Sequence, residues 1–562
     1  MKKILLIQTL IFAAFFSASA QNFEWAKGIQ GDVYNSGESI TYDAAGNSYI
    51  AGRFFDTVDF DPGAGVFNLT SGVGSDIYIL KLDALGDFVW AKSIGGTSED
   101  RPSSIHVDEG GDIYVTGFFS DTVDFDPGVG VNNLISEGFK DIFVLKLNSF
   151  GDFVWAKQFG GTANDEGYDI TVDVNRFVYV TGTFSGTADF DPGAGTSNLI
   201  SEGAFDGFVL KLLPSGDLNW VKKVGGPNDD DASFSIDLDS SNNVYTTGYF
   251  RDSVDFDPGA GTANVTSNGM RDGYILKFDG AGNYVWVKTI GSFAQDYVRD
   301  ITIDDATGDV FVTGEFQFTV DFDPGTDTAN LVSNGILDAY VLKLNANGDY
   351  VWAKSYGGDS FENSTSISLD GDGNIYTTGN FYDTADFDPG INTVNLIATG
   401  SSADIFILKL SPLGDYVWAG SIGETGDDLG NCITVDDACN IYTTGYYLDT
   451  ADFDTGTGTN TLFNNGGGQS YALKLSCQLT TGLDDDVFSN YSLSIYPNPT
   501  SSQLTINYEG EISEINIIDI KGKTIKQFSS AKTIEVADLV AGVYFLQIKS
   551  DRNVINRKFI KE

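Results

Sequence analysis

The sequence predicts an all-β protein, a seven-bladed β-propeller with four-stranded blades followed by a small Ig-like β-sandwich. Seven tryptophans recur every 65 or 66 residues, at positions 25, 90, 155, 220, 286, 352 and 418. Between them, aromatic and β-branched runs alternate with Gly, Asp and Asn turns, which is typical of antiparallel hairpins. From residue 491 onward the repeat stops and shorter alternating strands begin.

Each period contains the same series of extended segments, shown here by the second one. An Ile-x-apolar-Asp segment at 105–108 precedes an aromatic-x-Thr-Gly segment at 114–117. An acidic Asp-Phe-Asp-Pro-Gly segment, an apolar strand at 142–147 and the tryptophan strand at 153–157 follow. The apolar strand needs cover on both faces, and sheets stacked around an axis supply it.

The phase of the repeat predicts how the ring closes. The first segment after residue 20, at 23–27, is a tryptophan strand without the three strands that normally precede it, whereas the last period, at 433–475, lacks its tryptophan strand. We therefore expect the N-terminal strand to pair with the last blade. A buried tryptophan contributes about 4–6 kcal/mol before entropy costs. Loss of Trp25 should thus open the ring more readily than loss of an interior tryptophan.

The N-terminus has the pattern of a secretory signal peptide. Lys2 and Lys3 precede an apolar run at 4–16, and small residues at 17–20 form a cleavage site. No other stretch is long and apolar enough to predict a membrane-spanning helix. The predicted organisation is a signal peptide at 1–20, the propeller at 21–482, a linker at 483–490 and the sandwich at 491–562.

The charge balance excludes several classes of partner and enzyme. The chain has 32 basic and 79 acidic side chains and a formal net charge of −47, which argues against nucleic-acid binding and against docking on an anionic membrane. One histidine and three cysteines leave little material for a Ser-His-Asp triad, a Cys-His pair or a His-ligated metal. We predict no catalytic residue, and we expect cations, neutral sugars or basic proteins as partners.

Acidic side chains are expected to gather on one face of the ring. They lie mainly in the Asp-Phe-Asp-Pro-Gly segments and in the connectors between blades. Both sets emerge on the same rim of a four-stranded meander. The connectors include Glu99-Asp100, Asp165-Glu166, Asp229-Asp230-Asp231 and Asp427-Asp428.

Two interpretations of the Asp-Phe-Asp-Pro-Gly segments remain open. The two carboxylates lie on one side of an extended segment, an arrangement that suits Ca²⁺. Equally, Asp, Pro and Gly form turns that need no ion. The calcium interpretation involves Asp59, Asp61, Asp124, Asp126, Asp189, Asp191, Asp255, Asp257, Asp321, Asp323, Asp386, Asp388, Asp452 and Asp454. No other cofactor is predicted.

Three further side chains lead to specific expectations. Cys439 and Cys477 occupy two turns on the same rim of the last blade, which predicts a disulfide between them and leaves Cys432 free. The alternative pair, Cys432 and Cys439, flanks one short hairpin where the two positions are not directly opposed. His106 lies in a strand whose equivalents are Thr, Ser or Asp, so we expect it to face solvent.

Two family resemblances follow from these motifs. The Ile-x-Val-Asp hairpin with its Tyr-x-Thr-Gly strand, the Lys-Leu strand and the tryptophan strand resemble the SBBP-type bacterial β-propeller repeat. The C-terminal module is similar to the type IX secretion (type A) sorting domain of Bacteroidetes. The residues that carry this second resemblance are Tyr496, Pro497, Asn498, Pro499, Asp519, Gly522, Lys523, Leu539, Gly542, Tyr544, Lys558 and Lys561.

The second resemblance implies a route of export. It implies a periplasmic intermediate, recognition of residues 491–562 by the type IX secretion machinery, and delivery to the cell surface or the medium. The leading functional hypothesis is a non-enzymatic propeller that binds a glycan, an extracellular polymer or a protein through its acidic loop face. The alternatives are a carboxylate-dependent glycoside hydrolase and a structural coat protein. Against the hydrolase, the conspicuous acids are repeated, whereas a catalytic pair should be unique.

Overall fold

Every regular element that the computed structural model describes is a β-strand. The described residues are 21–227, 230–456, 458–464, 466–477, 494–496, 500–507, 514–519, 523–529, 531–540, 542–549 and 554–561. The predicted signal peptide at 1–20 and linker at 483–490 lie outside them. The chain divides into two compact units, one ending at Cys477 and the other beginning at Gln478.

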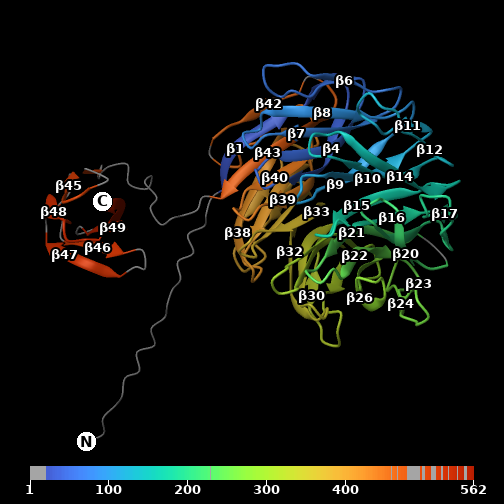
Figure 1. Cartoon of the computed structure of the whole chain (residues 1–562). Helices are drawn as coiled ribbons and strands as arrows, with labels where there is room; N and C mark the ends of the chain where they lie inside the picture. The colour runs from blue at the N-terminus through green and yellow to red at the C-terminus, as the bar shows by residue number, and fades with distance from the viewer. Residues whose placement is uncertain are drawn as a thin grey trace, which may run out of the picture. The chain divides into compact units, whose positions relative to one another are not determined.

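Seven four-stranded antiparallel sheets make up the described part of the first unit, and we number them in chain order (Figure 1). Sheet 1 contains β3 (Asn35–Tyr42), β4 (Ser48–Phe54), β7 (Asp76–Leu82) and β8 (Phe88–Ile94). Sheet 2 contains β9 (Arg101–Val107), β10 (Ile113–Phe119), β13 (Asp141–Leu147) and β14 (Phe153–Gly161). Sheet 3 contains β15 (Glu166–Val172), β16 (Val178–Phe184), β19 (Asp206–Leu212) and β20 (Leu218–Val224). Sheet 4 contains β21 (Ala232–Leu238), β22 (Val244–Phe250), β25 (Asp272–Phe278) and β26 (Tyr284–Ile290).

The remaining three sheets follow the same order. Sheet 5 contains β27 (Tyr297–Ile303), β28 (Val310–Phe316), β31 (Asp338–Leu344) and β32 (Tyr350–Gly358). Sheet 6 contains β33 (Glu362–Leu369), β34 (Ile375–Phe381), β37 (Asp404–Leu410) and β38 (Tyr416–Thr425). Sheet 7 contains β39 (Leu429–Val435), β40 (Ile441–Tyr447), β43 (Gln469–Cys477) and β1 (Gln21–Gly28).

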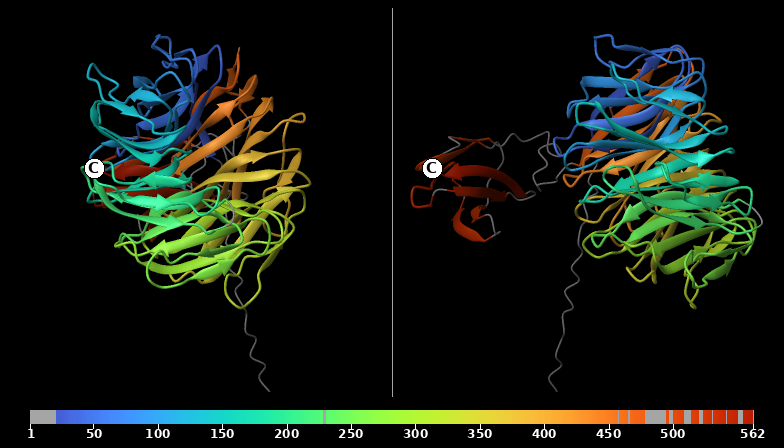
Figure 2. Two further views of the ribbon diagram at one scale, coloured as in Figure 1. Left: turned by 90° about the vertical axis from the view of Figure 1, so that its right-hand side faces the viewer. Right: turned by 45° about the vertical axis from the view of Figure 1, so that its right-hand side comes forward.

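The N-terminal strand completes the last sheet, as the phase of the repeat predicts. β1 pairs antiparallel with β43, and Trp25 lies opposite Lys474 (Figure 1). Sheets 1 and 7 also pack against each other, since the side-chain amide of Asn431 donates to the carbonyl oxygen of Gly37 over 2.8 Å. The two ends of this unit are therefore neighbours in space (Figure 2).

A short hairpin between the second and third strands of each sheet was not predicted from the sequence. The first strand of this hairpin ends at the first aspartate of the Asp-Phe-Asp-Pro-Gly segment. In several sheets it also pairs with the connector that precedes the sheet, and in sheet 1 that part of the connector is β2 (Gln30–Gly31). The aromatic ring inside each segment points inward and is fully buried, as Phe60 and Phe125 show. The hairpins are β5 (Thr57–Asp59) and β6 (Asn68–Thr70), β11 (Thr122–Asp124) and β12 (Asn133–Ile135), β17 (Thr187–Asp189) and β18 (Asn198–Ile200), β23 (Ser253–Asp255) and β24 (Asn264–Thr266), β29 (Thr319–Asp321) and β30 (Asn330–Val332), β35 (Thr384–Asp386) and β36 (Asn395–Ile397), and β41 (Thr450–Asp452) and β42 (Thr461–Phe463).

The repeated tryptophans join neighbouring sheets at their outer edges. Trp25 of sheet 7 packs against the turn at Gly86 in sheet 1, where a Cβ would lie 2.7 Å from the indole ring. Trp90 meets Gly151 in the same way. Both glycines have a φ near +77°, so the turn requires glycine for its backbone as well as for space.

The described part of the second unit contains two sheets that share a core. One sheet is β44 (Ser494–Tyr496), β45 (Gln503–Asn507) and β48 (Thr533–Glu535). The other is β46 (Glu514–Asp519), β47 (Thr524–Ser529), β49 (Gly542–Lys549) and β50 (Val554–Lys561). Leu504 and Ile534 from the first sheet pack with Ile517, Leu546 and Phe559 from the second. Pro497, Asn498, Pro499 and Gly522 of the sorting motif lie outside the described residues.

Candidate functional site

The predicted calcium residues act as turn caps. Asp59 Oδ1 accepts hydrogen bonds from the backbone N–H groups of Asp61 (3.1 Å) and Phe67 (2.8 Å), and Asp61 Oδ1 accepts one from Gly63 (2.8 Å). The same contacts recur in all seven copies. Among the residues that the structure describes, no group of three or more His, Cys, Asp or Glu side chains is arranged to hold a metal ion. Backbone capping therefore accounts for one oxygen of each carboxylate.

The repeated lysines of the third strands form internal contacts. Lys81 Nζ lies 4.6 Å from the centre of the Tyr49 ring and 3.7 Å from the carboxylate of Asp43, which caps the turn between the first two strands. In each of the other six sheets the equivalent lysine lies 4.6–5.1 Å from the centre of the equivalent aromatic ring. These lysines stabilise the sheets and are poorly placed to bind a ligand.

A cavity of about 950 Å³ lies beside these turns, lined mainly by residues of sheets 1, 2 and 7, with Thr171 of sheet 3 and Asp237 of sheet 4. Stacked Tyr42 and Tyr442, with ring centres 5.4 Å apart, lie at this side, and Tyr42 lines the cavity. His106 also lines it, so this side chain borders the cavity instead of the outer surface of the sheets. His106 is partly buried, and burial lowers its pKa to about 4. The histidine is therefore neutral at physiological pH.

Buried polar side chains connect the innermost strands. Asp169 accepts a hydrogen bond from Ser104 (2.7 Å), and the Ser235 hydroxyl lies 2.9 Å from Asp169 and 2.7 Å from Asp300, so its single proton bonds one of these two carboxylates at a time. Burial, and then the charge of Asp300, raise the pKa of Asp169 to about 6. Because serine and backbone donors occupy both carboxylates, the network holds neighbouring sheets together.

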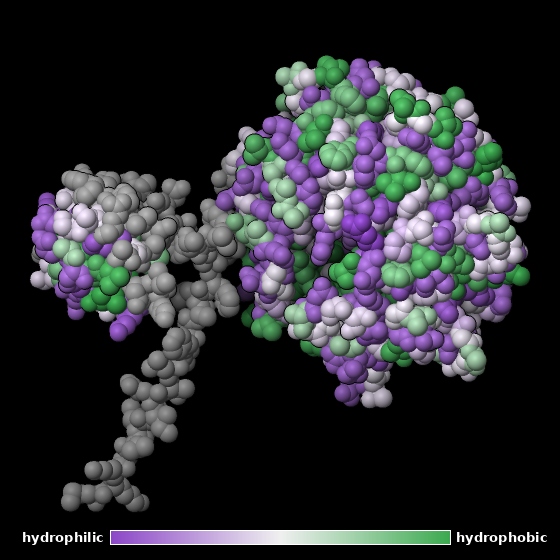
Figure 3. Space-filling view, viewed as in Figure 1, coloured by the Kyte–Doolittle hydropathy of each residue, from purple (hydrophilic) through white to green (hydrophobic). Residues whose placement is uncertain are grey.

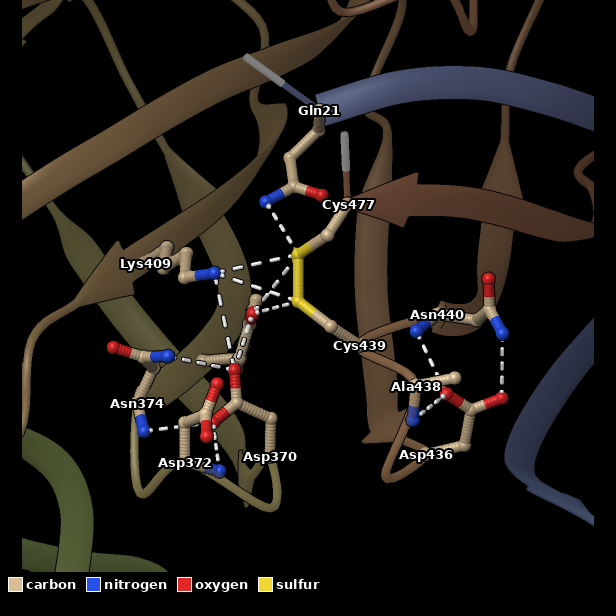
Figure 4. A network of polar contacts seen from close by, with 11 residues as sticks. Gln21, Asp370, Asp372, Asn374, Lys409, Asp436, Ala438, Cys439, Asn440 and Cys477 are labelled. Atoms are coloured by element: carbon tan, nitrogen blue, oxygen red, sulfur yellow. Dashed lines mark hydrogen bonds and ion pairs between the residues drawn. A yellow bond between two sulfur atoms is a disulfide. The ribbon is translucent and has the colours of Figure 1, made fainter. Parts of the chain in front are cut away.

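The disulfide lies at the side of sheet 7 that borders the cavity. Cys439 and Cys477 are bonded, and among the described cysteines Cys432 is free. Figure 4 shows Lys409 of sheet 6 pointing at the two sulfur atoms, with Nζ 3.4 Å from Cys439 Sγ and 3.3 Å from Cys477 Sγ. The side-chain amide of Gln21, the first residue of β1, also contacts Cys477 Sγ at 3.5 Å. The disulfide therefore lies where β1 joins β43 beside sheet 6.

The opposite rim, where the connectors arrive, breaks the repeat. The residue after each Thr-Gly or Ala-Gly pair differs in nature from sheet to sheet and lies near the start of the innermost strand. These residues are Arg53, Phe118, Thr183, Tyr249, Glu315, Asn380 and Tyr446. Such unique positions are where ligand contacts are expected on a repeated scaffold.

Two of these residues, Tyr249 and Glu315, belong with five neighbouring side chains to what we call the aromatic–arginine cluster, in sheets 3, 4 and 5. It consists of Tyr168, Phe234, Tyr249, Arg271, Tyr297, Arg299 and Glu315, and its aromatic and arginine members are partly exposed.

The rings of the aromatic–arginine cluster lie within contact distance of one another. The ring of Phe234 lies 5.8 Å from that of Tyr168 and 5.4 Å from that of Tyr249. Tyr297 is 5.4 Å from Tyr249 in an edge-on arrangement. Arg299 lies 4.4 Å from the centre of the Tyr297 ring. The result is a set of planar groups held at fixed angles.

Ion pairs hold the arginines of the cluster in place. Arg299 Nε donates to both carboxylate oxygens of Glu315, at 2.8 and 3.2 Å. Arg271 contacts the Asp230 carboxylate and the Tyr297 hydroxyl at 2.8 and 2.9 Å. The Glu315 side chain is only 3% exposed, so Arg299 lies between it and solvent.

Two further arginines engage another nearly buried rim carboxylate. Glu38 of sheet 1 lies 2.8 Å from Arg101 and 3.2 Å from Arg53, and its side chain is 8% exposed. Arg53 also lies over the ring of Tyr34 at 5.2 Å. Glu38 and Glu315 therefore both form ion pairs with arginine.

Half of the connector acids do not lie on the acidic surface that the sequence predicted. Asp100, Asp165, Asp231 and Asp428 are at most 1% exposed. Asp100, for example, accepts hydrogen bonds from the backbone N–H groups of Gly96 and Ser120. Asp229 lies outside the described residues. The space-filling view in Figure 3 shows hydrophilic and hydrophobic side chains interspersed over the visible face of the first unit.

Sequence reasoning missed the aromatic–arginine cluster because it followed the residues that repeat. The signal in the sequence was a position that does not repeat: the residue after Thr-Gly changes from sheet to sheet. Its members come from both ends of neighbouring strands, and only the paired register brings them together.

Comparison with known families confirms both resemblances. Residues 494–562 match the secretion system C-terminal sorting domain, and residues 154–187 match the beta-propeller repeat. The chain thus carries a propeller repeat and an export tail. Among the described residues, no helix long and apolar enough to cross a membrane is found.

Curated relatives are distant and longer. The chain is 25% identical over 459 residues to an uncharacterized WD repeat-containing protein of Acanthamoeba polyphaga mimivirus, covering 68% of this chain and 32% of that protein. It is 27% identical over 225 residues to regulatory protein FlaEY of Caulobacter vibrioides, covering 39% of this chain and 22% of that protein. The chain spans about a third or less of the length of these two relatives.

Solved structures are similar only at low scores. A protein of unknown function from Bacteroides caccae has a TM-score of 0.27 and 10% identity, covering 60% of this chain and 94% of that one. The extracellular domain of a protein described as a hybrid two-component system from B. thetaiotaomicron has a TM-score of 0.15 and 11% identity, covering 96% and 98%. At these TM-scores neither structure informs the function.

Proposed function

We propose that the first unit is a closed seven-bladed propeller that acts as a non-enzymatic binding protein for a neutral glycan, delivered by type IX secretion to the cell surface or the medium. The pairing of β1 with β43 and the contact between sheets 1 and 7 support closure of the ring. The match of residues 494–562 to the sorting domain supports the route. The second unit would then be the part that the secretion machinery recognises.

The aromatic–arginine cluster is the observation that carries the ligand class. Sugar rings present apolar C–H faces and hydroxyl edges, so they bind to partly exposed aromatic rings with planar donors beside them. The strongly negative protein disfavours acidic polysaccharides through long-range repulsion. A neutral glycan fits both features.

The state of two unique rim carboxylates, Glu38 and Glu315, argues against their use as a catalytic pair. A glycosidase needs two accessible carboxyl groups on either side of the scissile bond. Glu315 is held by Arg299, and Glu38 is held by Arg53 and Arg101, with both acids nearly buried. Neither is placed to donate a proton or to attack a sugar.

Binding of the mature full chain to an array of neutral and acidic glycans tests this function. We expect retention of neutral glycans without turnover. Tyr249→Ala should weaken that binding at least tenfold, which corresponds to about 1.4 kcal/mol. Tyr382→Ala, which removes a partly exposed rim tyrosine of sheet 6 outside the cluster, is the matched control and should bind normally. Hydrolysis abolished by replacing one acid, or equal binding by both variants, would contradict the proposal.

A further inference from the structure

Six of the seven seams between sheets contain two buried carboxyl groups that face each other. One comes from the start of the third strand of a sheet, and the other from the connector to the next sheet. The pairs are Asp76 with Asp100, Asp141 with Asp165, Asp206 with Asp231, Asp272 with Asp296, Asp338 with Glu362, and Asp404 with Asp428. Every member is at most 6% exposed.

Glycines allow the two groups to approach. A Cβ on Gly423 would lie 2.7 Å from Asp404 Oδ1 and 2.8 Å from Asp428 Oδ2, so these two oxygens are less than 5.5 Å apart. Gly160 and Gly357 stand between their pairs in the same way, close to a carboxyl carbon of one member and an oxygen of the other.

In the pair of Asp404 and Asp428, the oxygens that face across the seam lack donors. Asp404 Oδ1 and Asp428 Oδ2 are both buried without a hydrogen-bond partner, whereas Asp404 Oδ2 and Asp428 Oδ1 each accept a backbone N–H. Four other members of the pairs also have one buried oxygen without a partner, namely Asp141 Oδ1, Asp206 Oδ1, Asp272 Oδ1 and Glu362 Oε1. In the other five pairs the second member accepts one backbone N–H with its Oδ2 or Oε2. A buried acceptor without a donor is costly, and two buried anions without a cation are more so.

The seventh seam provides an internal comparison. There, between sheets 7 and 1, the equivalent side chains are Gln469 and Asn35, which are amides. Asn35 Nδ2 donates directly to Gln469 Oε1 over 3.1 Å. Gln469 Nε2 donates to the Gly31 carbonyl oxygen, and Asn35 Oδ1 accepts from the Ser470 N–H. An amide supplies the donor that a pair of carboxylates lacks.

We propose that each of the six carboxyl pairs binds one proton between its two members at neutral pH, so that these six seams weaken together when the medium becomes alkaline. The proton converts one carboxylate into a donor and leaves one negative charge, which is stabilised by hydrogen bonds donated by the backbone N–H groups of the seam. The pair then has the donor pattern of the amide seam. Backbone N–H groups on the outer oxygens favour a carboxylate and would not coordinate a metal ion.

The pair chosen for the test is Asp404 with Asp428, and the groups around it supply no positive charge. Asp427, Tyr447 and Tyr471 face Asp428, and none of them is a cation. Lys223 lies 3.2 Å from Asp206, so that pair is unsuitable for the test. The charged or titratable groups facing the other pairs are Asp121, Glu137, Glu166, Glu202, Asp230, Tyr274, Glu315, Tyr340, Asp359 and Asp383.

The direction of the pH effect follows from linkage. Burial raises the pKa of Asp404 to about 7 and that of Asp428 to about 8, above the value of about 3.9 in an unfolded chain. Stability from such a group is complete below the unfolded pKa and is lost as pH rises through the folded pKa. Between about pH 4 and 7, each bound proton makes the unfolding constant increase about tenfold per pH unit.

The test transfers the natural amide pair into a carboxyl seam. Asp404→Gln with Asp428→Asn reproduces the Gln469 and Asn35 arrangement, and Asp428→Asn alone is a second variant that leaves one acid. Asp415→Asn removes an exposed carboxylate of sheet 6 as the matched control. Unfolding by urea is followed from pH 5 to pH 9, and the infrared carbonyl band of protonated carboxyl groups is followed in the native full chain over the same range.

We expect the double variant to lose about one proton from the pH dependence of unfolding, a tenfold smaller change in the unfolding constant per pH unit. It should also lose part of the native infrared band at neutral pH, and the Asp415→Asn variant should retain both. An unchanged native band in the double variant overturns the proposal, even if unfolding proves irreversible. So does stabilisation of the parent protein by CaCl₂ that the double variant lacks, because the pair would then hold a cation.

Discussion

The seam between sheets 7 and 1 differs from the six internal seams in its buried polar pair and in the way the strand beside it joins its sheet. At an internal seam the chain itself runs from one sheet to the next, and a pair of carboxyl groups faces across the joint. At the closing seam the segment at 29–34 also connects β1 to β3, but β1 joins β43 by strand pairing without a hairpin between them, an amide pair replaces the acids, and a disulfide fixes the end of β43. Because no hairpin joins β43 to β1, the ring depends on additional specific contacts near this joint.

The largest expected effect is at Trp25. This side chain is 9% exposed, and its Nε1 donates to the Ala84 carbonyl oxygen at 3.2 Å, whereas Trp220 is more exposed and its Nε1 has no partner. Trp25→Ala should cost about 3–5 kcal/mol, and Trp220→Ala clearly less. Thermal unfolding midpoints of the two variants measure the difference. A Trp220→Ala midpoint as low as that of Trp25→Ala would show that closure is not the weak point.

The disulfide should have the next largest effect. Cys439 and Cys477 are 38 residues apart, and closing such a loop contributes roughly 3–4 kcal/mol in the chain-entropy description. Replacing both by serine should lower the unfolding midpoint, and reductant should lower that of the parent protein to match. Cys432→Ser is the matched control, because sheets 1, 2, 4 and 6 carry serine at that position. Insensitivity of the parent to reductant would show that this bond adds little to closure.

The smallest expected effect is that of calcium on the short hairpins, which occur in all seven sheets. Because the Asp59 and Asp61 oxygens already accept backbone N–H groups, we expect neither CaCl₂ nor a chelator to change the unfolding midpoint. Asp61→Asn retains the cap and should unfold like the parent. A midpoint that rises with calcium in the parent but not in this variant would favour the calcium interpretation.

Much of the fold could be predicted from the sequence because the same repeat occurs in it seven times. The spacing of the tryptophans and the unpaired strand at 23–27 were sufficient to place β1 beside β43. The short hairpins were missed because strands of three residues, such as Thr57–Asp59, are too brief for an alternating pattern to be visible. Their register depends on contacts with the connector.

Burial was harder to predict than topology. Asp100 and Asp428 belong to acidic dipeptides that look like solvated loops, yet each caps backbone groups beneath a hairpin. His106 shares its position with threonines and serines, and only the convergence of the inner strands places it against a cavity. The aromatic–arginine cluster needs three sheets in register, which no single repeat reveals.

Repeated positions stabilise the sheets, whereas the unrepeated positions after the glycine differ from sheet to sheet, and this separation can be used in protein engineering. Phe60, Trp25, Lys81 and their equivalents hold the sheets together through contacts that do not involve the seven positions after the glycine, so a library randomised at those positions should yield mostly folded proteins. Such a scaffold would be a source of new recognition surfaces, chosen by selection for binding.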